Sequence, residues 1–102
     1  MTPPRLSIVV AAIDAQDTIE ACLTALLTAT ADIPSDIVVV EASRDDTRRR
    51  AETFPTVRLI SAAPGVLVPH LWARGFHASR GTFVAFTLAL SLIHISEPTR
   101  PY

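Results

Sequence analysis

The chain has 102 residues, of which 49% are hydrophobic and 19% are charged, a balance typical of one ordinary globular domain. Its formal net charge of -1 gives no electrostatic reason to expect nucleic acid or an anionic membrane surface as a partner. The single cysteine excludes an intrachain disulfide, and we find neither a signal peptide nor an apolar run of the roughly 20 residues that a spanning helix needs. These features predict a cytoplasmic protein with no membrane segment in this chain.

The first two predicted elements are a strand and a helix. Residues 6–13, with the sequence LSIVVAAI, form a nearly continuous apolar run, which is typical of a strand buried on both faces of a parallel sheet. Asp17 and Glu20 then resemble a capping box at the start of a helix. Cys22 lies on the apolar face of that helix, so we expect it in the core rather than at a catalytic or metal site.

The rest of the chain continues this alternation of strands and helices. We expect Ser43 to cap a second helix, and the strand after it to lie near an edge of the sheet because it contains Arg58. Further strands are predicted at residues 36–40, 56–61 and 82–89, and a third helix at residues 69–81. This order predicts the α/β class, with an open, mostly parallel sheet and helices on both faces.

Two acids follow the predicted strands directly. Ligands of open α/β sheets bind beyond the carboxyl ends of the strands, and Asp14 and Glu41 both stand at such ends. From the residues alone, Glu41 can also be a solvated acid, and helix capping accounts for Asp45 and Asp46.

Three blocks of the sequence together resemble the start of a family 2 glycosyltransferase, over about residues 6–89. These blocks are LSIVVAAIDAQDTIEACLTALL, IVVVEASRDDT and GFHASRGTFVAF, in this order. The resemblance implies that residues 1–89 are a partial family 2 domain, the nucleotide-binding half of a Rossmann-like GT-A fold. It also implies a nucleotide-diphosphate sugar as partner, whose sugar the intact enzyme transfers to an acceptor hydroxyl.

The resemblance suggests roles for single residues. Asp14 stands where the family usually has Asn, Glu41 takes the place of the acid that binds the nucleoside base, and Gly65 is expected in a loop near the nucleotide. Arg74 and Arg80 can face the diphosphate or lie on the surface. No catalytic residue is assigned, because the family's catalytic carboxylate belongs to the second half of the domain.

The metal motif of the family is not matched. Leu88 and Leu90 occupy the two positions of its Asp-x-Asp pair, and neither side chain offers the oxygen donors that magnesium or manganese requires. A divalent cation is therefore implied only for the intact parent, and we expect this fragment to hold none.

The last residues raise a separate expectation. Residues 90–100, LSLIHISEPTR, resemble the translation of an adapter that is ligated onto DNA for sequencing, so residues 90–102 are expected to be a non-native tail. A fragment that ends in this way is expected to be inactive, marginally folded and able to self-associate through an exposed edge of its sheet.

Two other classes of function stay open. One is a different nucleotide-binding enzyme such as a nucleotidyltransferase, although no G-x-G-x-x-G or G-x-x-x-x-G-K-[ST] motif follows the first strand. The other is a non-catalytic α/β module that binds a nucleotide or a partner.

Overall fold

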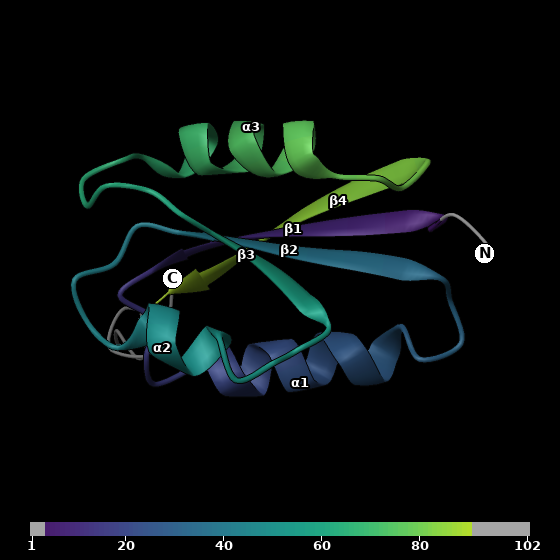
Figure 1. Ribbon diagram of the computed structural model, residues 1–102, viewed down its shortest axis with the longest axis horizontal. Helices are drawn as coiled ribbons and strands as arrows, with labels where there is room; N and C mark the ends of the chain where they lie inside the picture. Colours follow the sequence, from purple (N-terminus) through teal and green to yellow (C-terminus); the bar gives the residue numbers. More distant parts are fainter. Residues whose placement is uncertain (1–3, 91–102) are drawn as a thin grey trace, which may run out of the picture.

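The computed structural model describes residues 4–90, which form one sheet covered by helices on both faces (Figure 1). The strands are β1 (Leu6–Ile13), β2 (Ser35–Glu41), β3 (Val57–Ser61) and β4 (Phe83–Leu90), and the helices are α1 (Ile19–Ala29), α2 (Thr47–Ala51) and α3 (Val68–Ala78). All strand pairs are parallel, and the strand order is β3-β2-β1-β4. The predicted open parallel α/β sheet is confirmed, and β3 lies at an edge as expected from its arginine.

The two central strands have no polar face. Ile8, Val10 and Ala12 of β1 belong to the core on one side of the sheet, whereas Val9 and Ala11 belong to the core on the other. All five side chains are buried, because alternate residues of a strand point to opposite faces and both faces are covered. The continuous apolar run in the sequence therefore has a direct physical cause.

Helices α1 and α2 cover one face of the sheet and α3 covers the other (Figure 1). Ile19 and Leu23 fill the core beneath α1, and Leu71 fills the core beneath α3. Cys22 packs at the margin of the first core, where burial raises the pKa of its thiol and favours the neutral form. The expected packing role of Cys22 is confirmed. No helix within residues 4–90 is long and apolar enough to cross a bilayer.

The predicted capping box of Asp17 and Glu20 and the predicted cap at Ser43 are wrong, whereas Asp45 does accept from the amide of Thr47, the first residue of α2, at 2.9 Å. Helix α1 starts from a backbone turn in which the amide of Ile19 donates to the Ala15 carbonyl at 2.8 Å, and no cap side chain bonds its first turn. Helix α2 begins only at Thr47, and the Ser43 hydroxyl accepts a hydrogen bond from the Asp14 amide, 2.9 Å away, instead of capping the helix. Contacts between loops that are distant in sequence thus outweigh the local capping pattern.

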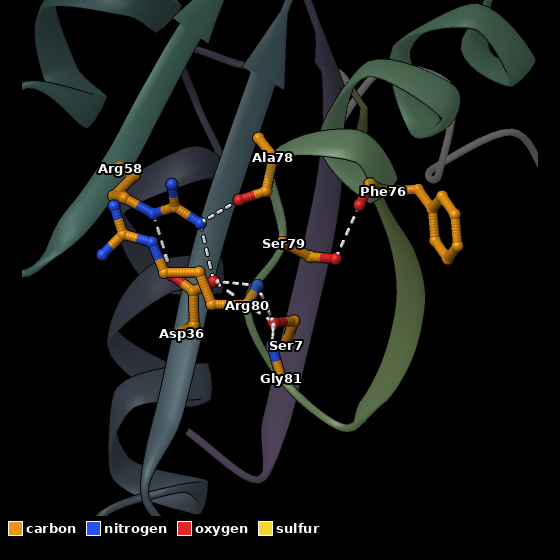
Figure 2. Close-up of polar contacts among 8 residues, drawn as sticks. All are labelled: Ser7, Asp36, Arg58, Phe76, Ala78, Ser79, Arg80 and Gly81. Carbon is orange, nitrogen blue, oxygen red and sulfur yellow. Dashed lines mark hydrogen bonds and ion pairs between the residues drawn. The ribbon is translucent and has the colours of Figure 1, made fainter. Parts of the chain in front are cut away.

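A polar cluster joins the strands at the amino end of the sheet (Figure 2). We call it the amino-end cluster, and it consists of Ser7, Asp36, Arg58, Arg80 and Gly81. Arg58 binds the Asp36 carboxylate through two nitrogens, at 2.9 and 2.7 Å. The buried Ser7 hydroxyl accepts from the Gly81 amide at 2.7 Å and donates to Asp36 at 3.2 Å. The cluster therefore ties β1, β2 and β3 to the segment that leads into β4.

This cluster also explains why α3 ends earlier than the sequence predicts. Ser79 has an extended backbone, so the chain leaves the helix at Ala78 and presents the amides of Arg80 and Gly81 to the cluster. A Cβ atom at Gly81 would lie 2.5 Å from the Ser7 nitrogen, so this close approach requires glycine. Apart from Leu90, which continues β4, the predicted non-native tail lies outside the described residues.

Candidate functional site

The carboxyl ends of β1 and β2 bring two loops side by side. Ala12 of β1 is in register with Glu41 of β2, so the residues after both strands emerge at the same end of the sheet. Asp14 is exposed and has a left-handed backbone with φ 47°, a conformation that aspartate tolerates better than most side chains. The first loop therefore turns sharply as it leaves the central strand.

Asp14 and the β2–α2 loop hold each other through a reciprocal pair of hydrogen bonds. The Asp14 amide donates to the Ser43 hydroxyl at 2.9 Å, and the Asp14 Oδ1 accepts from the Arg44 amide at 2.9 Å. Within residues 4–90, no group donates to the other carboxylate oxygen, Oδ2. Hydrogen bonds with Ser43 and Arg44 thus fix the left-handed turn at Asp14, and its Oδ2 remains able to accept a further hydrogen bond.

A second set of bonds continues the contact between the two loops. The Gln16 amide donates to Asp45 at 3.3 Å, and the Gln16 side chain accepts from the Asp46 amide at 3.1 Å. Beneath them, the buried Ala15 amide donates to the Thr47 hydroxyl at 2.7 Å. Five hydrogen bonds between residues 14–16 and residues 43–47 therefore hold the two loops in one fixed arrangement.

Hydrogen bonds within this arrangement favour the ionised form of Asp45. Burial raises the pKa of its carboxyl, but hydrogen bonds from the Thr47 hydroxyl and amide and from the Gln16 amide outweigh that effect. The pKa of Asp45 is therefore lower than its ordinary value.

Glu41 is placed differently from Asp14. Its side chain is only 3% exposed, and one carboxylate oxygen accepts from the Ser43 amide at 3.0 Å. Glu41 therefore shapes the β2–α2 loop from below, whereas Asp14 presents its carboxylate to solvent. The structure brings the two predicted acids together, with Ser43 bonded to both.

Gly65 is not joined to these acids. The β3–α3 loop starts beside Glu41, where the Ala62 amide donates to the Glu41 carbonyl at 2.8 Å. Gly65, with φ 98°, then lines a separate open hollow of about 500 Å³ together with Arg74. Arg80 belongs to the amino-end cluster, at the opposite end of the sheet from Asp14.

The strand order reverses beside Asp14. From β1 the chain runs through β2 to β3 on one side, and β4 then enters on the other side of β1. Such a switch point leaves a crevice beyond the carboxyl ends of the two strands that diverge, which is the usual ligand position in open α/β sheets. Asp14 is the first residue after β1 at this position.

The described residues at this end form no cluster of side chains suited to a divalent cation. Leu88 presents a hydrocarbon side chain, which offers no oxygen donor and is 42% exposed. Among residues 4–90, no three His, Cys, Asp or Glu side chains gather in a way that could hold a metal ion.

Sequence reasoning missed the groups that fix the site. Gln16, Ser43, Arg44 and Thr47 contribute through backbone amides and short polar side chains, for which no spacing rule exists. A usable signal is the density of such groups in SRDDT, immediately after a buried strand. Comparison with protein-family models and with curated protein sequences finds no match to this chain.

Proposed function

We propose that this chain is the nucleotide-sugar-binding, amino-terminal part of a glycosyltransferase of the family 2 type. The observation that carries the proposal is the left-handed, exposed Asp14 at the topological switch point, held by Ser43 and Arg44 of the neighbouring loop. A non-glycine residue in this conformation costs roughly 1–2 kcal/mol, and such strain is concentrated at ligand sites.

The chemistry of the site suits a nucleoside. The free Oδ2 of Asp14 can accept from a base N–H group or a ribose hydroxyl, and the fixed loop keeps that oxygen in place. Arg44 is exposed, and its guanidinium forms no ion pair within the described residues, so it can face the diphosphate. In this assignment Asp14 binds the nucleoside and Arg44 binds the diphosphate of the same ligand.

The proposed role is binding and orientation only. Sugar transfer to a hydroxyl also needs a base that takes the hydroxyl proton and positive charge at the leaving diphosphate. We assign no residue of this chain as the base, and we expect the chain by itself to be inactive as a transferase.

Calorimetric titration with nucleoside diphosphates that carry each common base tests the proposal. We expect one base to bind, and Asp14→Ala to weaken that binding by about tenfold or more, the equivalent of roughly 1.4 kcal/mol. Asp14→Asn, which keeps an acceptor and tolerates the left-handed backbone, should weaken it less. Circular dichroism verifies that each variant is folded.

The matched control is Asp32→Asn, an exposed acid in the α1–β2 loop at the amino end of the sheet. It should leave the affinity unchanged. Absence of binding for every base, or equal affinities of the Asp14→Ala variant and the unaltered chain, would refute the proposed function.

A further inference from the structure

We infer that the open edge of β4 is a self-association surface, on which a second copy of this chain adds its own β4 as an antiparallel neighbour. The two copies would be related by a twofold axis at Phe86 and would share one continuous sheet of eight strands, four from each copy. This inference does not depend on the proposed nucleotide site.

Among the residues that the structure describes, the backbone of β4 is paired on one side only. The Phe83 amide donates to the Arg5 carbonyl at 2.9 Å, which directs the backbone groups of Phe83 toward β1. Because alternate residues of a strand direct these groups to opposite sides, those of Val84, Phe86 and Leu88 point away from β1. Within residues 4–90, no strand lies beyond β4 to receive them.

The side chains of β4 offer no protection against pairing. Natural edge strands carry charges, prolines or bulges that prevent edge-to-edge contact, and the eight residues FVAFTLAL contain neither a charge nor a proline. Phe83, Phe86 and Leu88 are 64%, 46% and 42% exposed. The opposite edge strand, β3, is shorter and carries Arg58, so it has a charge that disfavours edge-to-edge pairing and β4 has none.

The pattern of β4 is complementary to itself. In an antiparallel pair centred on Phe86, each Phe86 faces its counterpart and Val84 faces Leu88 of the second copy. Each of these pairs exchanges two backbone hydrogen bonds. All three side chains lie on the face that α3 covers, so apolar groups meet apolar groups across the axis.

Contacts with Trp72 of α3 hold Phe86 and Thr87 in position at the centre of β4. The Trp72 ring of α3 lies 5.8 Å from the Phe86 ring, centroid to centroid, and the indole nitrogen donates to the Thr87 carbonyl at 3.0 Å. These two contacts anchor the middle of β4 to Trp72 of α3, and within residues 4–90 no strand covers the outer edge of β4.

A second copy is the occupant that these features favour. The surface is uncharged and self-complementary, and with a net charge of -1 two copies repel each other little. A twofold pairing uses the same strand of both copies, so it closes at a dimer and does not continue into fibres.

Sedimentation equilibrium of the full chain over a hundredfold range of concentration tests the inference. We expect a monomer–dimer equilibrium, and Leu88→Lys should weaken the dimer by tenfold or more because it places a charge in the paired edge. The matched control is Leu67→Lys, which alters a leucine 64% exposed in the β3–α3 loop and should leave the equilibrium unchanged. Phe86→Lys is the second variant, and circular dichroism verifies folding.

Hydrogen exchange of the β4 amides separates pairing from other ways of covering the edge. The amides of Val84, Phe86 and Leu88 should be protected in the dimer and should exchange rapidly in dilute Leu88→Lys. A chain that is monomeric throughout, with or without protected β4 amides, overturns the inference. Growth beyond dimers, or equal effects of Leu88→Lys and Leu67→Lys, also overturns it.

Discussion

Ser7 shows how one small hydroxyl holds distant parts of the chain. It is fully buried in β1, and its oxygen accepts from the amides of Arg80 and Gly81, at 3.2 and 2.7 Å. We expect Ser7→Ala to lower the free energy of unfolding by about 1–3 kcal/mol, because the Gly81 amide loses its acceptor and Asp36 loses a donor. Urea unfolding measures this loss. Ser61→Ala, an exposed serine of β3, is the control, and equal losses in both variants would contradict the structural role of Ser7.

Asp36 makes the amino-end cluster sensitive to acid. Burial raises the pKa of its carboxyl, but the hydrogen bonds and the positive charge of Arg58, with further bonds from Arg80 and Ser7, outweigh this effect. The pKa of Asp36 is therefore lower in the folded chain than in the unfolded chain, where it is about 3.9. The resulting stability is fully present above about pH 4 and is lost as the pH falls through the lowered pKa.

We expect Asp36→Asn to destabilise the chain at pH 7 and to flatten its loss of stability as the pH falls below about pH 4. Asp45 has a lowered pKa as well, so it contributes in the same window and part of the slope should remain. Urea unfolding at several pH values provides the measurement, with Asp32→Asn as the control. A slope unchanged by Asp36→Asn would show that the ion pair with Arg58 does not stabilise the fold.

At the scale of elements, Gly75 sets how closely α3 approaches the sheet. A Cβ atom at this position would overlap the Cγ1 of Val9 and would lie 3.1 Å from the Cγ2 of Val40. Alanine normally stabilises a helix interior by about 0.5–1 kcal/mol relative to glycine, but overpacking costs about 1–3 kcal/mol. We therefore expect Gly75→Ala to destabilise the chain in urea unfolding.

A second-site variant tests this cause. Val9→Ala removes the methyl group that a new Cβ would meet, so Gly75→Ala should cost less in the Val9→Ala background than in the unaltered chain. If the two effects simply add, or if Gly75→Ala stabilises the chain, the close contact between α3 and β1 is not the reason for glycine here.

The strands could be predicted from the sequence, whereas the caps expected at Asp17 and Ser43 were wrong. A strand buried on both faces needs apolar residues throughout, so β1 is recognisable at its observed bounds. Ser43 looks like a cap because its residue type suits capping, but its hydroxyl bonds Asp14, 29 residues away. Such a bond depends on the strand order, which no local pattern contains.

The positions of the candidate site residues could be predicted only in part. Asp14 and Glu41 could be placed at one end of the sheet because parallel strands end together. The burial of Glu41 and the separation of Gly65 from both acids follow from loop contacts, which sequence spacing does not determine. The family resemblance ranked Glu41 above Asp14 as the group that meets the base, whereas the exposed carboxylate in the structure is that of Asp14.

At the scale of the whole molecule, the amino and carboxyl ends of the sheet differ in the contacts that they make. In the amino-end cluster, Arg58 pairs with Asp36 and the Ser7 hydroxyl bonds the Gly81 amide, and these contacts stabilise the fold. The carboxyl end holds two loops in a fixed geometry and leaves a carboxylate open to solvent. This division is typical of open parallel sheets, in which ligands bind at the carboxyl ends of the strands.

The most direct test of this account is amide NMR of the full chain during titration with the nucleoside diphosphate that binds. The account predicts shift changes confined to the two carboxyl-end loops, residues 14–16 and 43–46, with the amides of Arg80 and Gly81 unchanged. Changes centred on the amino-end cluster or on the Gly65 hollow, or no changes at saturating ligand, would contradict it.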